Sequence, residues 1–276
     1  MAVAAPAAGQ ARAGRERQIH LPAQALALAG RSVRSTARQP EMWLPSMIFP
    51  LLIAAVNNSA MAKAVLLPGF PPVDSVLQFL LPATVVQGVM FGAVSGGSDL
   101  ALDIENGFFE RLIASPVARP AILVGRLAGG AVLGACQAVI FVVIFRVFGA
   151  HVVGGPPAVL VLMAMAVMVT LMVGGITAAV GIRTGSQESV DAAFPLIFIL
   201  LFMSSAFFPA ELMDGWFRWM AEHNPLSWMI DAARRLVLFG FDWSDAAVAV
   251  VVPGLISVLT IALAVRQMRK RLERAR

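Results

Sequence analysis

Long apolar runs separated by short polar segments dominate the pattern of this chain. Six of these runs approach the ~20 mostly apolar residues that a helix needs to cross a bilayer core about 30 Å thick. The sequence therefore predicts six membrane-spanning helices, at about residues 43–62, 76–98, 121–148, 157–182, 192–208 and 246–265. Small and aliphatic residues fill the runs without a two-residue alternation, which favours an all-α membrane protein over an outer-membrane barrel.

Basic segments flank the predicted six-helix region, residues 42–265. Residues 1–18 are expected to be a disordered cytoplasmic arm. They are not expected to be a secretory signal, because no unbroken apolar stretch follows their basic residues. Residues 19–41 interleave apolar positions with Arg31, Arg34 and Arg38, which predicts an interfacial amphipathic helix; a frayed basic linker is the alternative. Residues 266–276 form a basic cytoplasmic tail that should contact anionic membrane lipid.

Composition and charge agree with a membrane protein. Of the 276 residues, 59% are hydrophobic and 13% are charged, about half the charged fraction of a soluble domain. The net charge is +5, and 16 of the 21 basic residues fall on one predicted side of the membrane. Because cytoplasmic segments collect Lys and Arg, both termini are predicted to be cytoplasmic. The positive surplus thus indicates topology, and no nucleic-acid partner is expected.

The cytoplasmic loop between the second and third predicted spans mixes charged and aromatic side chains. Its candidate site residues are Glu105, Gly107, Phe108, Phe109, Glu110, Arg111 and Leu112. A short amphipathic helix with an exposed Phe pair suits docking into a groove on a soluble partner. The same pair could equally dip into the membrane interface, and the residue types alone leave both interpretations open.

The outer segment between the last two predicted spans, Pro209 to Asp245, is too long to be structureless. It carries four of the five tryptophans, and none of the five falls in mid-membrane, as an interfacial belt predicts. Asn224 and Pro225 read as an N-cap and a first helical residue, and Gly240 as a C-terminal cap. We expect two short amphipathic helices, one on each side of Asn224, half sunk in the outer leaflet.

Glycines recur at four-residue spacing in two of the predicted spans. Gly88, Gly92 and Gly96 lie in the second span, and Gly125 and Gly129 in the third. In a membrane helix this spacing allows neighbouring backbones to approach closely. These glycines are therefore predicted positions of helix packing.

The chain lacks the sequence motifs of an energy-converting or catalytic domain. It has no G-x-x-x-x-G-K-[ST] phosphate-binding loop, and its three histidines lie in separate regions, so no metal site is predicted. The predicted spans carry almost no mid-membrane charge, unlike those of ion-coupled transporters. We expect a non-catalytic chain without a cofactor of its own, for which another subunit supplies the energy of transport.

Three stretches in order resemble the permease subunits of type-2 ABC exporters, the family that includes daunorubicin-resistance and nodulation-factor exporters. They are Arg38-Gln39-Pro40, ENGFFERLIASPVARPAILVGRL at residues 105–127, and SSAFFPAELMDGWFRWMAEHNPLSWMIDAARRL at residues 204–236. The resemblance implies that the 105–112 loop is a coupling helix that docks on an ATP-binding subunit. It also implies that the outer segment is a re-entrant helical hairpin, with Pro209, Asn224, Pro225 and Arg234 at matched positions.

The resemblance further implies a permease subunit in the bacterial cytoplasmic membrane, working with a second permease chain, identical or different, and with ATP-binding subunits that hold ATP and Mg²⁺. The apolar, aromatic-poor spans favour outward movement of a hydrophobic or amphipathic substrate, a drug or a lipid. One alternative is a polysaccharide or lipo-oligosaccharide exporter of the same family. Another is a stand-alone secondary transporter, which the lack of mid-span charge and of an inverted repeat argues against.

Overall fold

The computed structural model describes residues 30, 34, 40–63, 65, 68, 70–107 and 119–274. Regular structure in these ranges is helical: α2 (Pro40–Ala60), α3 (Val76–Glu105), α5 (Arg119–Val147), α6 (Gly155–Thr184), α7 (Gln187–Phe202), the 3-10 helix η2 (Ala210–Leu212), α8 (Gly215–His223), α9 (Pro225–Leu238) and α10 (Trp243–Arg274). The expected arm, nearly all of the expected interfacial helix, and residues 108–112 of the predicted coupling loop lie outside the described residues.

Five helices in the described ranges are long and apolar enough to cross a membrane, at Trp43–Ala60, Val76–Glu105, Leu123–Val147, Gly155–Thr184 and Trp243–Glu273. The predicted all-α membrane protein is confirmed at this level. The fifth predicted span differs, because α7 has 16 residues and reaches only about 24 Å at 1.5 Å per residue. Six crossings of the membrane therefore stay a prediction.

Three helices differ from the predicted spans at their ends, where polar contacts replace the apolar run. α3 continues past residue 98 to Glu105, and α10 continues through the basic tail to Arg274. α7 starts at Gln187 rather than at 192, because the Ser186 side chain caps it by accepting a hydrogen bond from the Ser189 amide at 3.3 Å. It ends at Phe202 rather than at 208, since the chain after it turns toward α9.

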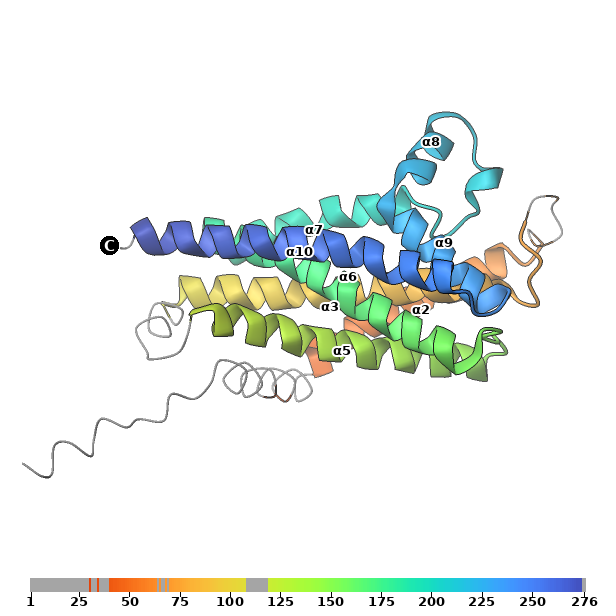
Figure 1. Cartoon of the computed structure of the whole chain (residues 1–276), viewed down its shortest axis with the longest axis horizontal. Coiled ribbons are helices and arrows are strands. Elements are labelled where there is room, and N and C mark those ends of the chain that lie inside the picture. The colour runs from red at the N-terminus through yellow and green to blue at the C-terminus, as the bar shows by residue number, and fades with distance from the viewer. Residues whose placement is uncertain are drawn as a thin grey trace, which may run out of the picture.

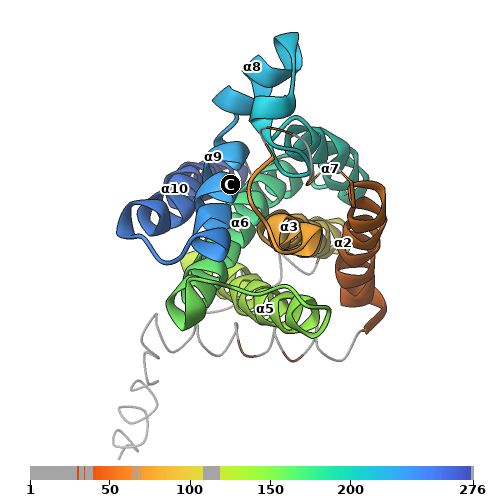
Figure 2. The same cartoon turned by 90° about the vertical axis from the view of Figure 1, so that its right-hand side faces the viewer.

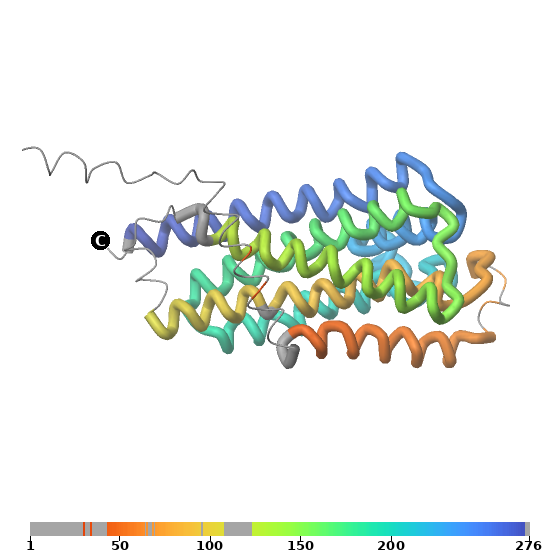
Figure 3. Tube along the Cα trace, turned by 90° about the horizontal axis from the view of Figure 1, so that it is seen from below, coloured from red at the N-terminus to blue at the C-terminus, as the bar shows by residue number. Residues whose placement is uncertain are grey.

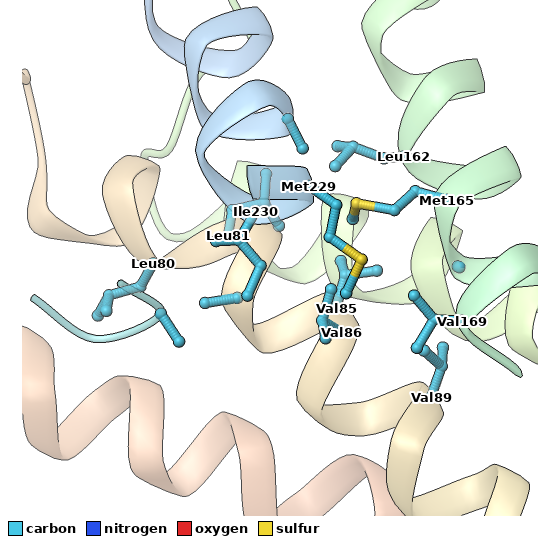
Figure 4. Packing of buried hydrophobic residues seen from close by; sticks show 14 of the residues in the cluster. Leu80, Leu81, Val85, Val86, Val89, Leu162, Met165, Val169, Met229 and Ile230 are labelled. Atoms are coloured by element: carbon cyan, nitrogen blue, oxygen red, sulfur yellow. The ribbon is translucent and has the colours of Figure 1, made fainter. Parts of the chain in front are cut away.

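α3 and α6 form the centre of the bundle, and α2, α5, α7 and α10 surround them (Figure 2). α6 packs along α10, α3 and α5, while α3 also contacts α2, α7 and α9. The largest cluster of buried side chains fills the space between α3, α6 and α9. Met229 of α9 reaches into it between Val85 and Val86 of α3 and Met165 of α6, and Ile230 of α9 lies beside Leu81 (Figure 4). α3 and α6 are central because each of them buries side chains against several neighbouring helices.

Two glycines of α3 mark the closest approaches to its neighbours. A Cβ atom at Gly88 would lie 2.3 Å from a ring carbon of Phe141 on α5. A Cβ atom at Gly97 would lie 2.3 Å from the Thr177 side chain on α6. Only a residue without a side chain fits at these distances, so both positions set how near the helices can come.

The other glycines predicted to pack differ among themselves. A Cβ atom at Gly92 would be 3.5 Å from Gln137, an ordinary contact, and one at Gly96 would meet nothing within 4 Å. Gly125 and Gly129 are buried on α5. The close contact with α6 thus falls to Gly97 and not to Gly96, because a shift of one residue turns a helix position by about 100°.

The bundle has two distinct ends (Figures 1 and 3). At one end, called here the tail end, lie the C-terminus, the last residues of α3 and the start of α5. At the opposite end, called the α8–α9 end, α8 stands out from the side of the bundle (Figures 1 and 2). Glu105 and Gly107, the two described residues of the predicted coupling loop, therefore lie at the opposite end of the bundle from the predicted outer site residues.

Candidate functional site

The α8–α9 end is organised around one buried arginine. Arg234 of α9 is 5% exposed, and its Nε atom donates to the Phe79 carbonyl of α3 at 3.1 Å. Its Nη2 atom donates to the carbonyls of Ser205 and Ala206 at 2.9 and 3.0 Å, and Nη1 donates to Asp231. The guanidinium also lies 3.7 Å from the centre of the Phe79 ring. One side chain thus ties α9 to α3 and to the segment after α7.

Asp231 completes this arrangement, called here the Arg234 hub. Its second carboxylate oxygen accepts a hydrogen bond from the Ser205 hydroxyl at 2.8 Å. Burial raises the pKa of Asp231, and the charge of Arg234 opposes that rise. Burial lowers the pKa of Arg234 to about 10, so the guanidinium is still charged at neutral pH. The Arg234 hub is therefore an ion pair in which the arginine is buried and the aspartate is partly exposed.

Asn224 makes a second link beside the hub. Its Oδ1 atom accepts from the Leu226 amide at 2.9 Å and so caps α9, as the sequence predicts. Its Nδ2 atom donates to the carbonyls of Leu200 and Met203 at 2.7 and 3.2 Å. These carbonyls belong to the end of α7, where no helical partner is available. One side chain consequently starts α9 and closes α7.

The structure brings three of the four predicted outer residues together. Asn224 and Arg234 make the links just described, and Pro225 is the first residue of α9 between them. Pro209 instead precedes the 3-10 helix η2 and takes no part in the hydrogen bonds of the hub. Asp231 was not anticipated, although its position three residues before Arg234 is a spacing at which helical side chains meet.

Polar contacts also join the helices at the tail end. Glu105 is the last residue of α3, and its Oε1 atom accepts a hydrogen bond from the Gln187 amide at the start of α7, at 2.8 Å. Two turns back along α3, the Ser98 hydroxyl donates to Asp191 of α7 at 2.6 Å. The end of α3 is thus fastened to the first turns of α7.

Two arginines extend these links to α5 and α10. Arg126 of α5 forms an ion pair with Asp103 of α3 at 2.5 Å. Arg271 of α10 donates to the Ile182 carbonyl near the end of α6 at 3.2 Å, where a cation is favoured by the helix dipole. The ion pair of Arg126 thus joins α5, which follows the predicted coupling loop, to α3 and through it to α7, while Arg271 links α10 separately to α6.

The predicted coupling loop begins directly after these contacts. Asn106 caps α3, and Gly107 has a φ of 65°, a left-handed conformation that favours glycine and turns the chain. Of the seven predicted coupling residues, Glu105 and Gly107 are described; Phe108, Phe109, Glu110, Arg111 and Leu112 lie outside the described residues. Their docking role stays a prediction.

A row of phenylalanine rings connects α2, α3 and α7 between the two ends. It consists of Phe49, Phe91, Phe194, Phe198, Phe202 and, just after α7, Phe207, with successive ring centroids 4.8–5.3 Å apart. This phenylalanine row is partly open, since Phe49 is 39% and Phe202 is 47% exposed. Among the described residues, no group of His, Cys, Asp and Glu side chains could hold a metal ion.

A helical bundle with several membrane-length helices and polar links at both ends defines a multi-pass membrane protein. The chain belongs to the ABC-2 type transporter family, whose sequence profile matches residues 23–238. It is an ABC transporter permease, as the resemblance of its loops predicted. The permease relatives also support a non-catalytic role within a transporter that includes an ATP-binding subunit.

Several curated relatives are similar along most of the chain. A daunorubicin resistance ABC transporter permease protein of Streptomyces coeruleorubidus is 28% identical over 218 residues, 78% of this chain and 74% of the relative. A probable doxorubicin resistance ABC transporter permease protein of Mycobacterium tuberculosis is 22% identical over 218 residues, 79% of this chain and 78% of the relative. A putative transport permease of Porphyra purpurea is 26% identical over 226 residues, 79% and 75% of the two chains.

Proposed function

We propose that this permease moves hydrophobic or amphipathic compounds outward across a bacterial cytoplasmic membrane. Two relatives named for daunorubicin and doxorubicin resistance support a lipophilic, partly aromatic substrate. The phenylalanine row is the observation that carries the proposal. Its rings are partly exposed along α2, α3 and α7, and aromatic faces of this kind bind planar apolar molecules by offset or edge-on stacking.

The proposed topology has six crossings with both termini in the cytoplasm. The tail end then faces the cytoplasm, which agrees with the basic residues at the end of α10. α7 is the fifth crossing, and a helix this short can be accommodated by local thinning of the bilayer. α8 and α9 form the outer re-entrant hairpin, with the exposed Trp216 and Trp219 side chains at the outer interface.

The proposed assembly contains two permease chains and two ATP-binding subunits. The Gly107–Leu112 segment is the coupling element that contacts an ATP-binding subunit, and ATP and Mg²⁺ are held there rather than on this chain. Closure of the ATP-binding subunits shifts the tail ends of the two permease chains and opens the substrate path outward. The polar contacts at the end of α3 support this role, because a displacement of that end acts on α5 and α7 together.

Doxorubicin transport into inside-out vesicles tests the proposal. Vesicles contain this chain with its ATP-binding subunit, and the quenching of doxorubicin fluorescence reports uptake. ATP-dependent uptake that disappears when the ATP-binding subunit carries an inactive phosphate-binding loop is the expected result. Uptake driven by a proton or sodium gradient without ATP would instead establish a stand-alone secondary transporter.

Binding of the ATP-binding subunit is tested separately by co-purification from detergent-solubilised membranes. Deletion of Gly107–Leu112 should abolish co-purification of the ATP-binding subunit while the permease stays in the membrane. Stoichiometric co-purification after the deletion would refute the coupling role of this segment. Failure of doxorubicin uptake alongside normal co-purification would refute only the substrate class.

A further inference from the structure

The link between α6 and α7 is a tight elbow at the tail end. α6 ends at Thr184 and α7 begins at Gln187, so that Gly185 and Ser186 alone connect them. Gly185 has a φ of 66°, and its amide donates to the Gly181 carbonyl at 2.8 Å. A Cβ atom at Gly185 would meet Arg271 at 3.1 Å and Ile104 at 3.3 Å. The elbow therefore fits closely between α10 and the end of α3.

Glu105 fastens this elbow to the residue from which the coupling loop departs. The Gln187 amide lies in the first turn of α7, where an amide has no partner within the helix. The Glu105 carboxylate fills that position at 2.8 Å, and a negative charge is favoured there by the helix dipole. Since Glu105 is the last residue of α3, this one hydrogen bond connects the residue at which the loop begins directly to the start of α7.

α7 depends on these contacts more than the central helices depend on theirs. Only Val190 and Leu201 are buried among its 16 residues, and near its start it is held to α3 by Glu105 and by the bond between Ser98 and Asp191. α3 itself is held against α6 at Gly97. A displacement of the end of α3 therefore shifts the elbow and the lightly held α7 together.

We propose that Glu105 is a positioning residue that carries movement of the coupling loop into α7. Three rings of the phenylalanine row lie on α7, so the same hydrogen bond links the loop to the proposed substrate surface. In Figure 3 the start of α7 lies beside the end of α3, at the tail end of the bundle. The inference rests on the proposed function, because the movement originates in the ATP-binding subunit.

The sequence allows the hydrogen bond to be removed from either side. Glu105→Ala removes the acceptor, whereas Glu105→Gln keeps an oxygen that can accept and removes only the charge. Gln187→Pro removes the donor at the first helical position, where proline is tolerated. The preceding Ser186 has a ψ of 125°, the extended conformation that a residue before proline adopts. Glu188→Ala is the matched control, because it removes an exposed carboxylate from the same turn of α7.

The movement of α7 is measured on the complex of the full chain with its ATP-binding subunit in lipid nanodiscs. A bimane label is placed at Leu196→Cys, where the α7 side chain is 68% exposed, or at Leu259→Cys on α10, where it is 69% exposed. Both are made in a Cys136→Ala background, because that cysteine is exposed. ATP with vanadate should shift the emission of the label at position 196.

Glu105→Ala and Gln187→Pro should each reduce that shift by about threefold or more, within the range by which single residues change coupling. Glu105→Gln, which keeps the hydrogen-bond acceptor and loses only the charge, should retain most of the shift, and Glu188→Ala should leave it unchanged. None of the four substitutions should change the response of the label at position 259. An undiminished shift in Glu105→Ala or Gln187→Pro, an equal loss in Glu188→Ala, or no shift at position 196 without these substitutions would overturn the inference. If the ATP-binding subunit does not co-purify with the permease that lacks these substitutions, the proposed function itself is overturned.

Discussion

Arg234→Met tests whether the Arg234 hub holds the α8–α9 end onto the bundle. The substitution removes the donors to Asp231 and to the Phe79, Ser205 and Ala206 carbonyls and keeps most of the apolar volume. Breaking one side of a buried ion pair costs about 3–5 kcal/mol. The Asp231 side chain is 31% exposed and can be partly rehydrated, so the lower end of that range, about 3 kcal/mol of unfolding free energy, is expected.

Arg235→Met is the matched control for this loss. Arg235 is the next residue of α9 and pairs with Asp245 at 2.6 Å, but its side chain is 49% exposed. An exposed ion pair contributes about 0–1 kcal/mol. Reversible unfolding in mixed micelles, followed by tryptophan fluorescence, measures both variants in the same assay. The two adjacent arginines should therefore differ by roughly 2–3 kcal/mol.

A double variant separates the lost pair from lost packing. In Asp231→Leu with Arg234→Met both charges are absent, so no carboxylate is left without its partner, and a large part of the stability should return. An Arg234→Met variant that loses no more free energy than Arg235→Met would refute the hub as a structural link. A double variant less stable than Arg234→Met would show that Asp231 stabilises the fold without the arginine.

Two further predictions concern stability and use the same unfolding assay. Gly97→Ala should destabilise the bundle by about 1–3 kcal/mol, because its Cβ would lie 2.3 Å from Thr177, whereas Gly96→Ala, with nothing within 4 Å, should be neutral or stabilising by up to about 1 kcal/mol. The opposite order would contradict the packing of α3 on α6. Asn224→Ala should lose the α9 cap and the donor to the Leu200 carbonyl, at about 2–3 kcal/mol, while Asn224→Ser should regain about 1 kcal/mol as a cap. Equal losses would show that the cap contributes nothing.

The sequence predicts the start or end of a helix well where the groups that determine it lie within a few residues of one another. Asn224 and Pro225 identify the start of α9 from residue type alone, because capping involves groups two or three residues apart. The end of α7 is harder to predict. Apolar residues continue to about position 208, but the carbonyls of Leu200 and Met203 bond to Asn224, a partner in a different helix that no local pattern indicates.

The candidate site shows the same division at residue level. The family motifs identify Asn224 and Arg234. The three-residue spacing between Asp231 and Arg234 would also have allowed their pairing to be predicted, because side chains at this spacing meet on one face of a helix. The pairing of Arg234 with Phe79 joins positions 155 residues apart, and no pattern near either residue indicates it. The contact of Glu105 with Gln187, across 82 residues, is equally remote.

The sequence by itself determined the class of this protein. Apolar length indicates a membrane protein, and the three stretches that resemble type-2 ABC exporters indicate a permease subunit of that family. Only the tertiary structure decided which faces meet, such as Gly97 rather than Gly96 against α6. The reason is physical: a membrane helix is apolar on all sides, so hydropathy fixes its length but cannot choose the face that packs. That choice depends on shape and on buried polar partners far away in the chain.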